Sequence, residues 1–423
     1  MGSLCFSLFM IIAASGSGLL FGVESKTYWG DIEVLKEFKN GIDPASLTAG
    51  SCVASWDFTL DPCDNLFGEK FTCGFRCDLV ISGTSRVTEL SLDQAGYAGS
   101  LASTWNLPFL VTLDFSNNYF SGQVPESLSN LTRLRRLGLS RNSFAGEIPA
   151  SIGSLSNLEE LYLDNNNLQG TIPGSFSGLV SLKRLEIQLN KLSGQLPDLG
   201  SLKSLYYLDA SDNAISGQVP ASLPSSLVEL SIRNNSLGGS LTSKSFINLE
   251  YLQVVDLSYN RIGGSVPLVL FELASLQQLI LSFNQLSSIE TPSYHGVGSR
   301  SGLIAIDISN NNLRGFLPSF MALMPKLSSL SLENNKFRGM IPTQYALKTV
   351  YPESGMSPFE RLLLAGNYLF GLIPSPLMAL KPDSANVRLV DNCLYRCPLI
   401  FFFCQGGQQK SLQECRRFNP LIP

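Results

Sequence analysis

Few side chains of this 423-residue chain could carry out catalysis. Its single histidine, His295, follows Ser293 and precedes Asp307, and a serine, a histidine and an acid are the components of a nucleophilic triad. No Gly-x-Ser-x-Gly sequence stands in a strand–turn–helix context to present such a serine. Because every histidine-dependent proton transfer and every histidine-liganded metal site would have to use His295, the composition excludes most classes of enzyme.

Carboxylates offer a second kind of chemistry. Glu159, Glu160 and Asp164 are close together in the sequence, and a glycosidase needs two carboxylates about 5 to 9 Å apart. We expect these side chains to line an open sheet, with no cleft that would desolvate them. No phosphate-binding glycine-rich loop and no metal-binding motif is present. The sequence therefore predicts a protein that is not an enzyme and that needs no cofactor or metal.

The composition also limits the partners. The chain has 30 basic and 34 acidic residues and no run of Lys or Arg, so it lacks the positive surface that nucleic acids require. Hydrophobic residues make up 44% of the chain and charged residues 15%, which is ample material for a core.

The N-terminus is typical of an exported protein. Residues 4–14 are apolar, residues 15–18 read Ser-Gly-Ser-Gly, and the chain becomes polar at Glu24. This pattern predicts a signal peptide over residues 1–25 and a secreted protein of the extracellular space, the cell wall or the cell surface. Because no Lys or Arg precedes the apolar stretch, a retained anchor is the alternative; otherwise we expect no membrane span. Sequons at Asn130 and Asn234 predict N-glycosylation.

The cysteines agree with export. Cys5 lies in the predicted signal peptide, and no cysteine occurs between residues 77 and 393. The other eight form two groups near the two ends: Cys52, Cys63, Cys73 and Cys77, and Cys393, Cys397, Cys404 and Cys415. This distribution predicts disulfide-stapled caps on both sides of a long middle region. Structural zinc is the alternative, but it requires a reducing compartment.

The middle region repeats one pattern, LxxLxLxxN. It appears in register at residues 134–142, 158–166 and 182–190, which gives a period of about 24 residues. The asparagines that end the pattern form a series: Asn118, Asn142, Asn166, Asn190, Asn213, Asn235, Asn260, Asn284, Asn311, Asn335, Asn367 and Asn392. With a degenerate opening unit around Leu90, about 13 units cover residues 87–392.

Strand side chains alternate between two faces, so the leucines of LxL lie on one face of a short strand and their neighbours on the other. No single unit can bury its leucines, but stacked units can, because their strands pair into one parallel sheet over a continuous core. We expect each asparagine amide to donate to and accept from backbone groups of the turn that follows the strand.

The outward positions of the strands are the candidate binding surface. In the first half they are charged and aromatic, and we select Arg136, Glu160, Tyr162, Asp164, Arg184, Glu186, Tyr207, Asp209 and Arg233 as ligand-binding residues. Arg and Tyr supply much of the energy of protein interfaces. In the second half, residues such as Ile280, Ser309 and Ser331 offer little for recognition. The alternative is that the charged face only holds neighbouring strands together through opposite charges.

The second half of each unit, as in Gly146-Glu-Ile-Pro149 and Gly170-Thr-Ile-Pro173, resembles the GxIP motif of plant-type extracellular leucine-rich repeats. The resemblance implies an α/β solenoid: a right-handed superhelix with a concave parallel β-sheet, disulfide-stapled caps, and a second short strand from the GxIP stretch. The unit of Asn235 departs from the motif and the unit of Asn284 lacks it, so the second strand is in doubt in both units.

The flanks resemble the caps of the same family. Trp56, Asp61-Pro-Cys63 and Gly74-Phe-Arg-Cys77-Asp78 are similar to the W…DPC…GVxCD signature of the N-terminal cap. We therefore expect an N-terminal cap over residues 26–86, the repeats over 87–392 and a C-terminal cap over 393–423. Residues 31–41 have the spacing of an amphipathic helix, with Asp31 suited to the N-cap and Gly41 to the position after the helix.

The stack of repeats separates the two cysteine groups by far more than a disulfide can span, which leaves three pairings at each end. The resemblance favours Cys63–Cys77, since these two occupy the family's slots, and leaves Cys52 for Cys73. At the other end Cys397–Cys404 with Cys393–Cys415 is favoured over Cys393–Cys397.

The family resemblance implies a secreted recognition protein similar to receptor-like proteins without kinase or membrane anchor. Its ligand would be an extracellular protein, peptide or glycan, with a receptor-kinase ectodomain or a wall enzyme among the candidate partners. The alternative is an inhibitor of a wall-degrading enzyme such as a polygalacturonase. A structural wall protein with no specific ligand is a third hypothesis.

Overall fold

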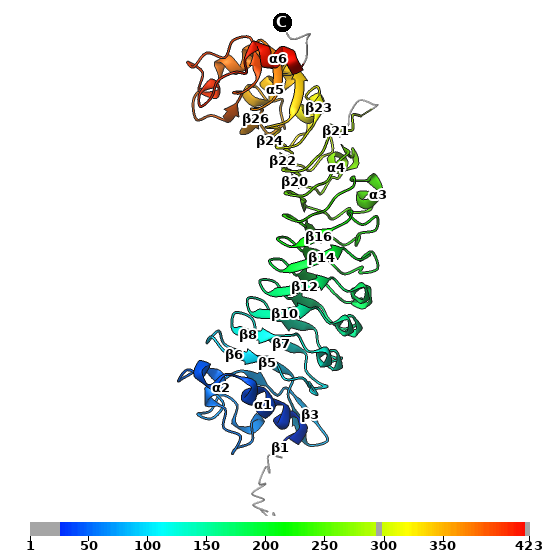
Figure 1. Ribbon diagram of the computed structural model, residues 1–423, viewed down its shortest axis with the longest axis vertical. Helices are drawn as coiled ribbons and strands as arrows, with labels where there is room; N and C mark the ends of the chain where they lie inside the picture. The colour runs from blue at the N-terminus through cyan, green and yellow to red at the C-terminus, as the bar shows by residue number, and fades with distance from the viewer. Residues whose placement is uncertain (1–25, 293–297, 419–423) are drawn as a thin grey trace, which may run out of the picture.

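The computed structural model describes residues 26–292 and 298–418. The chain winds into one elongated, curved solenoid with a cap at each end (Figure 1). The predicted signal peptide, Ser293, His295 and the last five residues of the predicted C-terminal cap lie outside the described residues.

A 14-stranded sheet runs the length of the solenoid. Its first strand, β2, is antiparallel to β5, and all later neighbours are parallel. In order the strands are β2 (Phe75–Arg76), β5 (Glu89–Ser91), β7 (Thr112–Asp114), β9 (Arg136–Gly138), β11 (Glu160–Tyr162), β13 (Arg184–Glu186), β15 (Tyr207–Asp209), β17 (Glu229–Ser231), β18 (Val254–Asp256), β20 (Gln278–Ile280), β22 (Ala305–Asp307), β24 (Ser329–Ser331), β26 (Arg361–Leu363) and β28 (Asn386–Arg388). This is the parallel sheet that the repeat predicts and that the family resemblance implies to be concave.

The leucine at the centre of each strand forms the core. Leu137, Leu161 and Leu185 are direct neighbours in the register of β9, β11 and β13, and all three are fully buried. Burying one such side chain contributes roughly 1.5–3 kcal/mol. The same register places the residues on either side of each leucine on the opposite face, where they are open to a ligand.

The asparagine series forms a ladder along the turns. The Oδ1 of Asn166 accepts from the backbone N–H of Phe144 in the preceding repeat (3.0 Å), and its Nδ2 donates to the carbonyls of Leu139, Leu163 and Asp164 (2.9–3.1 Å). All twelve asparagines accept from the preceding repeat in this way. The predicted role of the asparagine is therefore confirmed.

The second strand of the repeats forms an outer layer in three pieces. They are β6 (Ala98–Ser100), β8 (Tyr119–Gly122), β10 (Ser143–Glu147), β12 (Asn167–Thr171), β14 (Lys191–Gln195) and β16 (Ala214–Ser216); then β19 (Ser265–Val266) and β21 (Ser288–Ile289); then β23 (Arg314–Gly315), β25 (Lys336–Gly339), β27 (Tyr368–Gly371) and β29 (Cys393–Leu394). The unit of Asn235, where the strand was in doubt, has only the isolated bridge Ser240–Gly263. The unit of Asn284 does form β21, but the layer is interrupted after it.

Short helices connect the two layers on the side away from the 14-stranded sheet (Figure 1). They are the 3₁₀ turns η3 (Glu126–Asn130), η4 (Ala150–Ser154), η5 (Gly174–Gly178), η6 (Ser319–Leu323) and η7 (Ser375–Ala379), and the α-helices α3 (Ser243–Phe246), α4 (Val269–Glu272) and α5 (Thr343–Val350). The longest, α5, lies in the extended repeat between Asn335 and Asn367, where the side chain of Tyr345 is fully buried.

The N-terminal cap covers the first edge of the core. It contains β1 (Lys26–Thr27), α1 (Trp29–Gly41), η1 (Pro44–Ser46), α2 (Cys52–Ser55), η2 (Cys63–Asn65), β3 (Leu79–Ile81) and β4 (Thr84–Arg86). The expected ends of the first helix were wrong. Asp31 lies inside the first turn and is buried against Arg86, and Gly41 is the last residue of the helix. A side chain at Gly41 would place its Cβ 3.0 Å from the backbone oxygen of Ser100, which explains the glycine.

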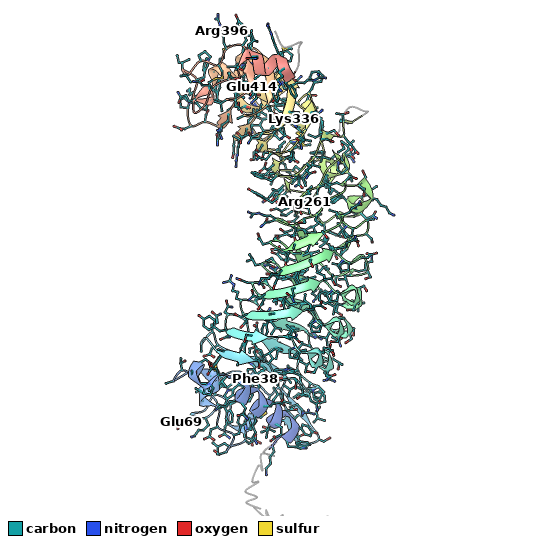
Figure 2. All side chains as sticks on the ribbon, in the orientation of Figure 1. Phe38, Glu69, Arg261, Lys336, Arg396 and Glu414 are labelled. Atoms are coloured by element: carbon teal, nitrogen blue, oxygen red, sulfur yellow. A yellow bond between two sulfur atoms is a disulfide. The ribbon has the colours of Figure 1, made fainter. Side chains whose placement is uncertain are left out.

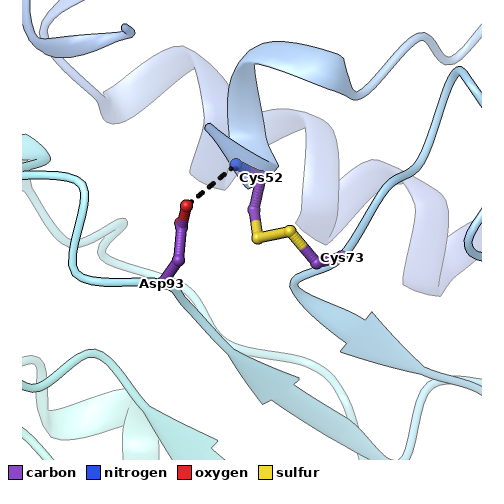
Figure 3. Close-up of side chains that lie close together, drawn as sticks. All are labelled: Cys52, Cys73 and Asp93. Carbon is purple, nitrogen blue, oxygen red and sulfur yellow. Dashed lines mark hydrogen bonds between the residues drawn. A yellow bond between two sulfur atoms is a disulfide. The ribbon is translucent and has the colours of Figure 1, made fainter. Parts of the chain in front are cut away.

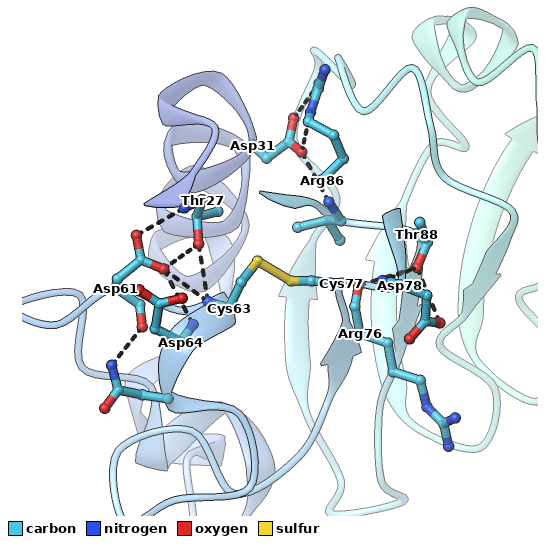
Figure 4. Close-up of a disulfide and its surroundings, with 12 residues drawn as sticks. Thr27, Asp31, Asp61, Cys63, Asp64, Arg76, Cys77, Asp78, Arg86 and Thr88 are labelled. Atoms are coloured by element: carbon cyan, nitrogen blue, oxygen red, sulfur yellow. Dashed lines mark hydrogen bonds and ion pairs between the residues drawn. A yellow bond between two sulfur atoms is a disulfide. The ribbon is translucent and has the colours of Figure 1, made fainter. Parts of the chain in front are cut away.

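The cap disulfides are Cys52–Cys73 and Cys63–Cys77, the pairs that the family resemblance favours. Figure 4 shows why an aspartate precedes Cys63: the Asp61 carboxylate accepts from the backbone N–H of Cys63 (3.1 Å) and of Thr27 (2.9 Å). Asp61 therefore ties β1 to η2 beside the Cys63–Cys77 bond.

The C-terminal cap contains β29, η8 (Phe402–Cys404) and α6 (Leu412–Phe418), stapled by Cys393–Cys415 and Cys397–Cys404. These are again the favoured pairs. Among the described residues, no helix is both long and apolar enough to cross a lipid bilayer.

Candidate functional site

Eight of the nine predicted ligand-binding residues lie together on the outward face of β9, β11, β13 and β15. Arg136, Glu160, Arg184 and Tyr207 occupy the same register position on these four successive strands. Tyr162, Glu186 and Asp209 share the next outward position, and Asp164 lies two residues after the end of β11. Because the parallel register is regular, residues about one repeat apart in the sequence lie side by side on neighbouring strands.

Arg136 joins three strands. Its guanidinium donates to Oδ2 of Asp114 (3.1 and 3.2 Å) and to Oε2 of Glu160, and it lies 4.4 Å from the ring centroid of Tyr162. The Tyr162 hydroxyl donates to the same carboxylate oxygen of Glu160 (3.1 Å). Burial opposes the charge of Arg136, but its hydrogen bonds with Asp114 and Glu160 outweigh burial and raise its pKa.

Arg184 is held in a similar way two repeats further along. Its Nε donates to Oε1 of Glu186 (2.5 Å), and its guanidinium lies 3.6 Å from the ring centroid of Tyr207. Gln188 donates to the other oxygen of Glu186 (3.0 Å), while the buried Oε1 of Gln188 has no hydrogen-bond partner among the described residues. The two arginines and two tyrosines are thus positioned before any ligand binds.

Carboxyl groups are in excess on this face. Burial raises the pKa of Asp164, Asp209 and Glu229, and the nearby charge of Glu186 raises all three further. Asp164 accepts from the hydroxyl of Ser140, and Asp209 accepts from the backbone of Ser211, but these contacts only partly offset burial. The electrostatics favour a ligand that brings positive charge.

A hollow of about 650 Å³ opens at the N-terminal side of the patch. Arg136, Tyr162, Asp164 and Glu186 line it, together with Asp114 and Arg141. The hollow is open and its lining is mainly polar, which distinguishes it from the enclosed, mainly apolar pockets that bind small molecules.

Comparisons with known proteins agree with this architecture. The profile of the family described as "Leucine-rich repeat region" matches residues 91–343. The chain belongs to the leucine-rich repeat family. Its sequence is 33% identical to Receptor-like protein 32 of Arabidopsis thaliana over 143 residues, and 43% identical to lumican of Mus musculus over 94 residues. These matches cover 28% and 22% of this leucine-rich repeat chain, but only 16% and 27% of the two relatives.

Solved plant receptor ectodomains have the same fold. The plant peptide hormone receptor RGFR1 in complex with RGF2 is 30% identical, with a TM-score of 0.66 over 73% of this chain and 48% of that one. The ectodomain of the Arabidopsis receptor kinase HAESA, in complex with an extended IDA peptide hormone, is 28% identical, with a TM-score of 0.62 over 87% of this chain and 62% of that one. The repeats are therefore of the plant extracellular type, and the chain spans less than two thirds of each of these proteins.

Arg233, the ninth predicted residue, does not contact the other eight in this leucine-rich repeat protein. It lies 5.5 Å from the ring centroid of Tyr259, which stacks on Phe283 at 4.2 Å. Both rings sit directly before a ladder asparagine, where the backbone is left-handed (φ 54° and 56°) and most other repeats have a smaller or polar residue. Sequence reasoning missed this pair, although two aromatic residues at a position that disfavours them were a visible signal.

Sequence reasoning also missed a charged cluster, Glu333, Arg361 and Arg388, in the C-terminal half of the repeats. The outward positions of that half were expected to offer little for recognition. The Glu333 carboxylate lies 3.5 Å from Nη1 of Arg388, and burial raises the pKa of Glu333 despite the opposing charges of Arg388 and Arg361. The strand register would have placed all three outward, because they occupy the same outward positions as the residues of the first half.

One cluster in the N-terminal cap has the composition of a metal site. Cys52, Cys73 and Asp93 place their ligand atoms within 4.8 Å of one another (Figure 3). The two sulfur atoms are bonded to each other, however, and Asp93 accepts from the backbone N–H of Cys52 (3.3 Å). The cluster therefore serves to staple the cap to the first repeat.

Proposed function

We propose that this chain is an extracellular, non-catalytic binding protein that holds a peptide on the concave face of its first seven repeats. The observation that carries the proposal is the pair of fixed arginine–tyrosine contacts, Arg136–Tyr162 and Arg184–Tyr207, beside an open hollow. Side chains that are already ordered lose little freedom when a ligand binds. The two plant receptors named above are bound to peptide hormones, which supports a peptide ligand over a glycan or a wall enzyme.

The charge of the face indicates the chemistry of the peptide. Apart from Glu159 and Lys183, which form an ion pair with each other, five carboxyl groups lie in the region between β11 and β17, those of Glu160, Asp164, Glu186, Asp209 and Glu229, against the two guanidinium groups of Arg184 and Arg233. Each arginine already contacts an aromatic ring, and Arg184 also contacts a carboxylate. The ligand that complements this surface carries Lys, Arg or a free N-terminal amine.

The alternative, a charge ladder that only joins strands, has support in the contacts of Arg136 with Asp114 and Glu160 on both sides. It does not account for Asp209 and Glu229, which form no ion pair among the described residues and whose pKa values are raised by burial. We therefore favour binding over a purely structural role.

Affinity selection of displayed peptides on the secreted protein tests the proposal. Selection is run in parallel on the wild type and on an Arg184→Ala/Tyr207→Ala variant. Peptides enriched on the wild type alone, with Lys or Arg at recurring positions, are the expected result. Equal enrichment on both proteins would place the site elsewhere, and inhibition of a polygalacturonase by the wild type alone would favour the inhibitor hypothesis.

A further inference from the structure

The outer layer carries a column of side chains, one from each repeat. The residue after the glycine at the end of each outer strand folds over the glycine of the next repeat. A Cβ built on Gly170 would lie 2.8 Å from Cγ of Glu147, and one built on Gly371 would lie 3.1 Å from Cγ of Met340. The members are therefore neighbours from one repeat to the next in the six-stranded piece and again from Phe316 to Leu372, and most of them are exposed.

The chemistry of this column changes along the molecule. In the first eight repeats that have it, its members are polar: Ser100, Gln123, Glu147, Thr171, Gln195, Gln218, Ser240 and Ser265. In the four-stranded piece formed by β23, β25, β27 and β29, they are Phe316, Met340 and Leu372, which are 71%, 69% and 68% exposed. Tyr395, which is 71% exposed, lies next to this row, because its backbone N–H donates to the carbonyl of Gly371 (3.0 Å). We call Phe316, Met340 and Leu372 the apolar column. A row of bulky side chains that all remain exposed at the same structural position marks an interaction surface.

Cations flank the apolar column. Arg314 and Arg338 are exposed on β23 and β25, the Arg338 guanidinium lies 5.8 Å from the ring centroid of Phe316, and that of Arg396 lies 5.5 Å from the ring centroid of Tyr395. Figure 2 shows Lys336 and Arg396 in this C-terminal part of the solenoid. The four strands of this piece contain no acidic residue, whereas the six-stranded piece contains one acidic residue, Glu147, and one basic residue, Lys191.

A hollow of about 340 Å³ adjoins the Phe316 end of the column. Its lining is mainly apolar and includes Ile289, Phe316, Leu317 and Phe320, with Arg314 at its side. A hollow of this kind can receive one apolar anchor side chain of a partner, and such buried anchors carry much of the energy of an interface.

We propose that the apolar column and its flanking arginines form a docking surface for an acidic, aromatic-containing segment of another protein. The surface is separate from the concave site and does not depend on it. Charge complementarity selects the occupant: the flanking cations have no acidic neighbours in their own sheet, so two copies of this chain face to face would bring like charges together. Phe, Tyr, Met and Arg are also the residues enriched in protein–protein interfaces, which favours a protein over a lipid surface.

A labelled random copolymer of glutamate and tyrosine serves as the probe, with polyglutamate and a lysine–tyrosine copolymer as comparison probes. Binding is measured by fluorescence anisotropy at physiological ionic strength for the wild type, for Phe316→Ser/Met340→Ser/Leu372→Ser and for Arg314→Gln/Arg338→Gln. The matched control, Thr171→Ser/Gln195→Ser/Gln218→Ser, changes the same column in the six-stranded piece. Circular dichroism verifies that all four proteins are folded.

The expected result is that the glutamate–tyrosine copolymer binds the wild type and the control equally, binds both test variants at least tenfold more weakly, and is preferred over both comparison probes. Equal binding to all four proteins, or no binding to the wild type, would overturn the proposal. So would self-association of the wild type that the serine variant loses, which would assign the surface to a second copy. Binding to phosphatidylcholine vesicles containing one fifth phosphatidylserine, in place of the copolymer, would assign it to a membrane.

Discussion

The guanidinium of Arg184 lies 3.6 Å from the ring centroid of Tyr207 on the adjacent strand of the concave sheet. This contact fixes the two side chains that we regard as the centre of the binding surface. Burial raises the pKa of Tyr207 to about 12, and the charges of Glu229, Asp209 and Glu186 act in the same direction. The hydroxyl is therefore protonated at neutral pH and can donate a hydrogen bond to a ligand.

The excess of carboxylates on this face predicts a pH dependence of stability. The folded-state pKa of Asp209 is raised, so folding is favoured progressively as the pH falls through that pKa, because the folded protein binds the proton more tightly than the unfolded chain. An Asp209→Asn variant keeps an oxygen that accepts from the N–H of Ser211 but cannot titrate. The melting temperature of the wild type, relative to this variant, should rise by a few degrees between pH 7 and pH 4. A difference that is the same at every pH would contradict the assignment.

A second prediction concerns the ion pair between α1 and β4. Nε and Nη2 of Arg86 donate to the two oxygens of Asp31 (2.9 and 2.8 Å), and both side chains are buried. Removing one partner leaves a buried charge without compensation, so Asp31→Ala should lower the free energy of unfolding by about 3–5 kcal/mol in denaturant titration. Glu33→Ala breaks the exposed pair with Lys36 and should cost at most about 1 kcal/mol. Equal effects of the two substitutions would mean that the Asp31–Arg86 pair does not organise the cap.

The asparagine ladder should be important for stability at its most buried steps. Asn367 is fully buried, accepts from the N–H of Phe337 (3.1 Å) and donates to the carbonyl of Leu332 (2.9 Å). Asn367→Ala leaves these backbone groups unpaired and should cost at least about 2 kcal/mol of unfolding free energy. Asn157→Ala, at an exposed position, should stay within about 0.5 kcal/mol. A similar cost for both would show that the ladder bonds are replaced when they are lost.

Glycosylation tests the predicted compartment. Asn130 ends η3, Asn234 lies on the turn beside Arg233, and both side chains are exposed. Protein purified from its native source should lose mass on treatment with an N-glycosidase, and Asn130→Gln and Asn234→Gln should each remove one glycan. An unmodified protein that retains residue 1 in the cytosol would refute secretion.

The sequence predicts the features that recur in every repeat. The buried leucines and the asparagine ladder follow from one unit, because each repeat places its residues in the same register as the last. Contacts between different elements do not follow from this periodicity. Asp31 has the position of an N-cap in the sequence, yet its partner is Arg86, 55 residues away. The stack of Tyr259 on Phe283 and the apolar column depend on contacts between side chains one repeat apart, and only the structure shows these contacts.

The central claim is that the concave patch binds a ligand, and affinity measured on matched truncations tests it most directly. With a peptide obtained by the selection described above, Tyr162→Ala, Arg184→Ala and Tyr207→Ala should each weaken binding in calorimetry by more than about 1 kcal/mol. Ile280→Ala, Ser309→Ala and Ser331→Ala, on the bland strands of the same sheet, should leave binding unchanged. If the first three substitutions lower the melting temperature while the affinity survives, the patch is a structural charge ladder and the claim is wrong.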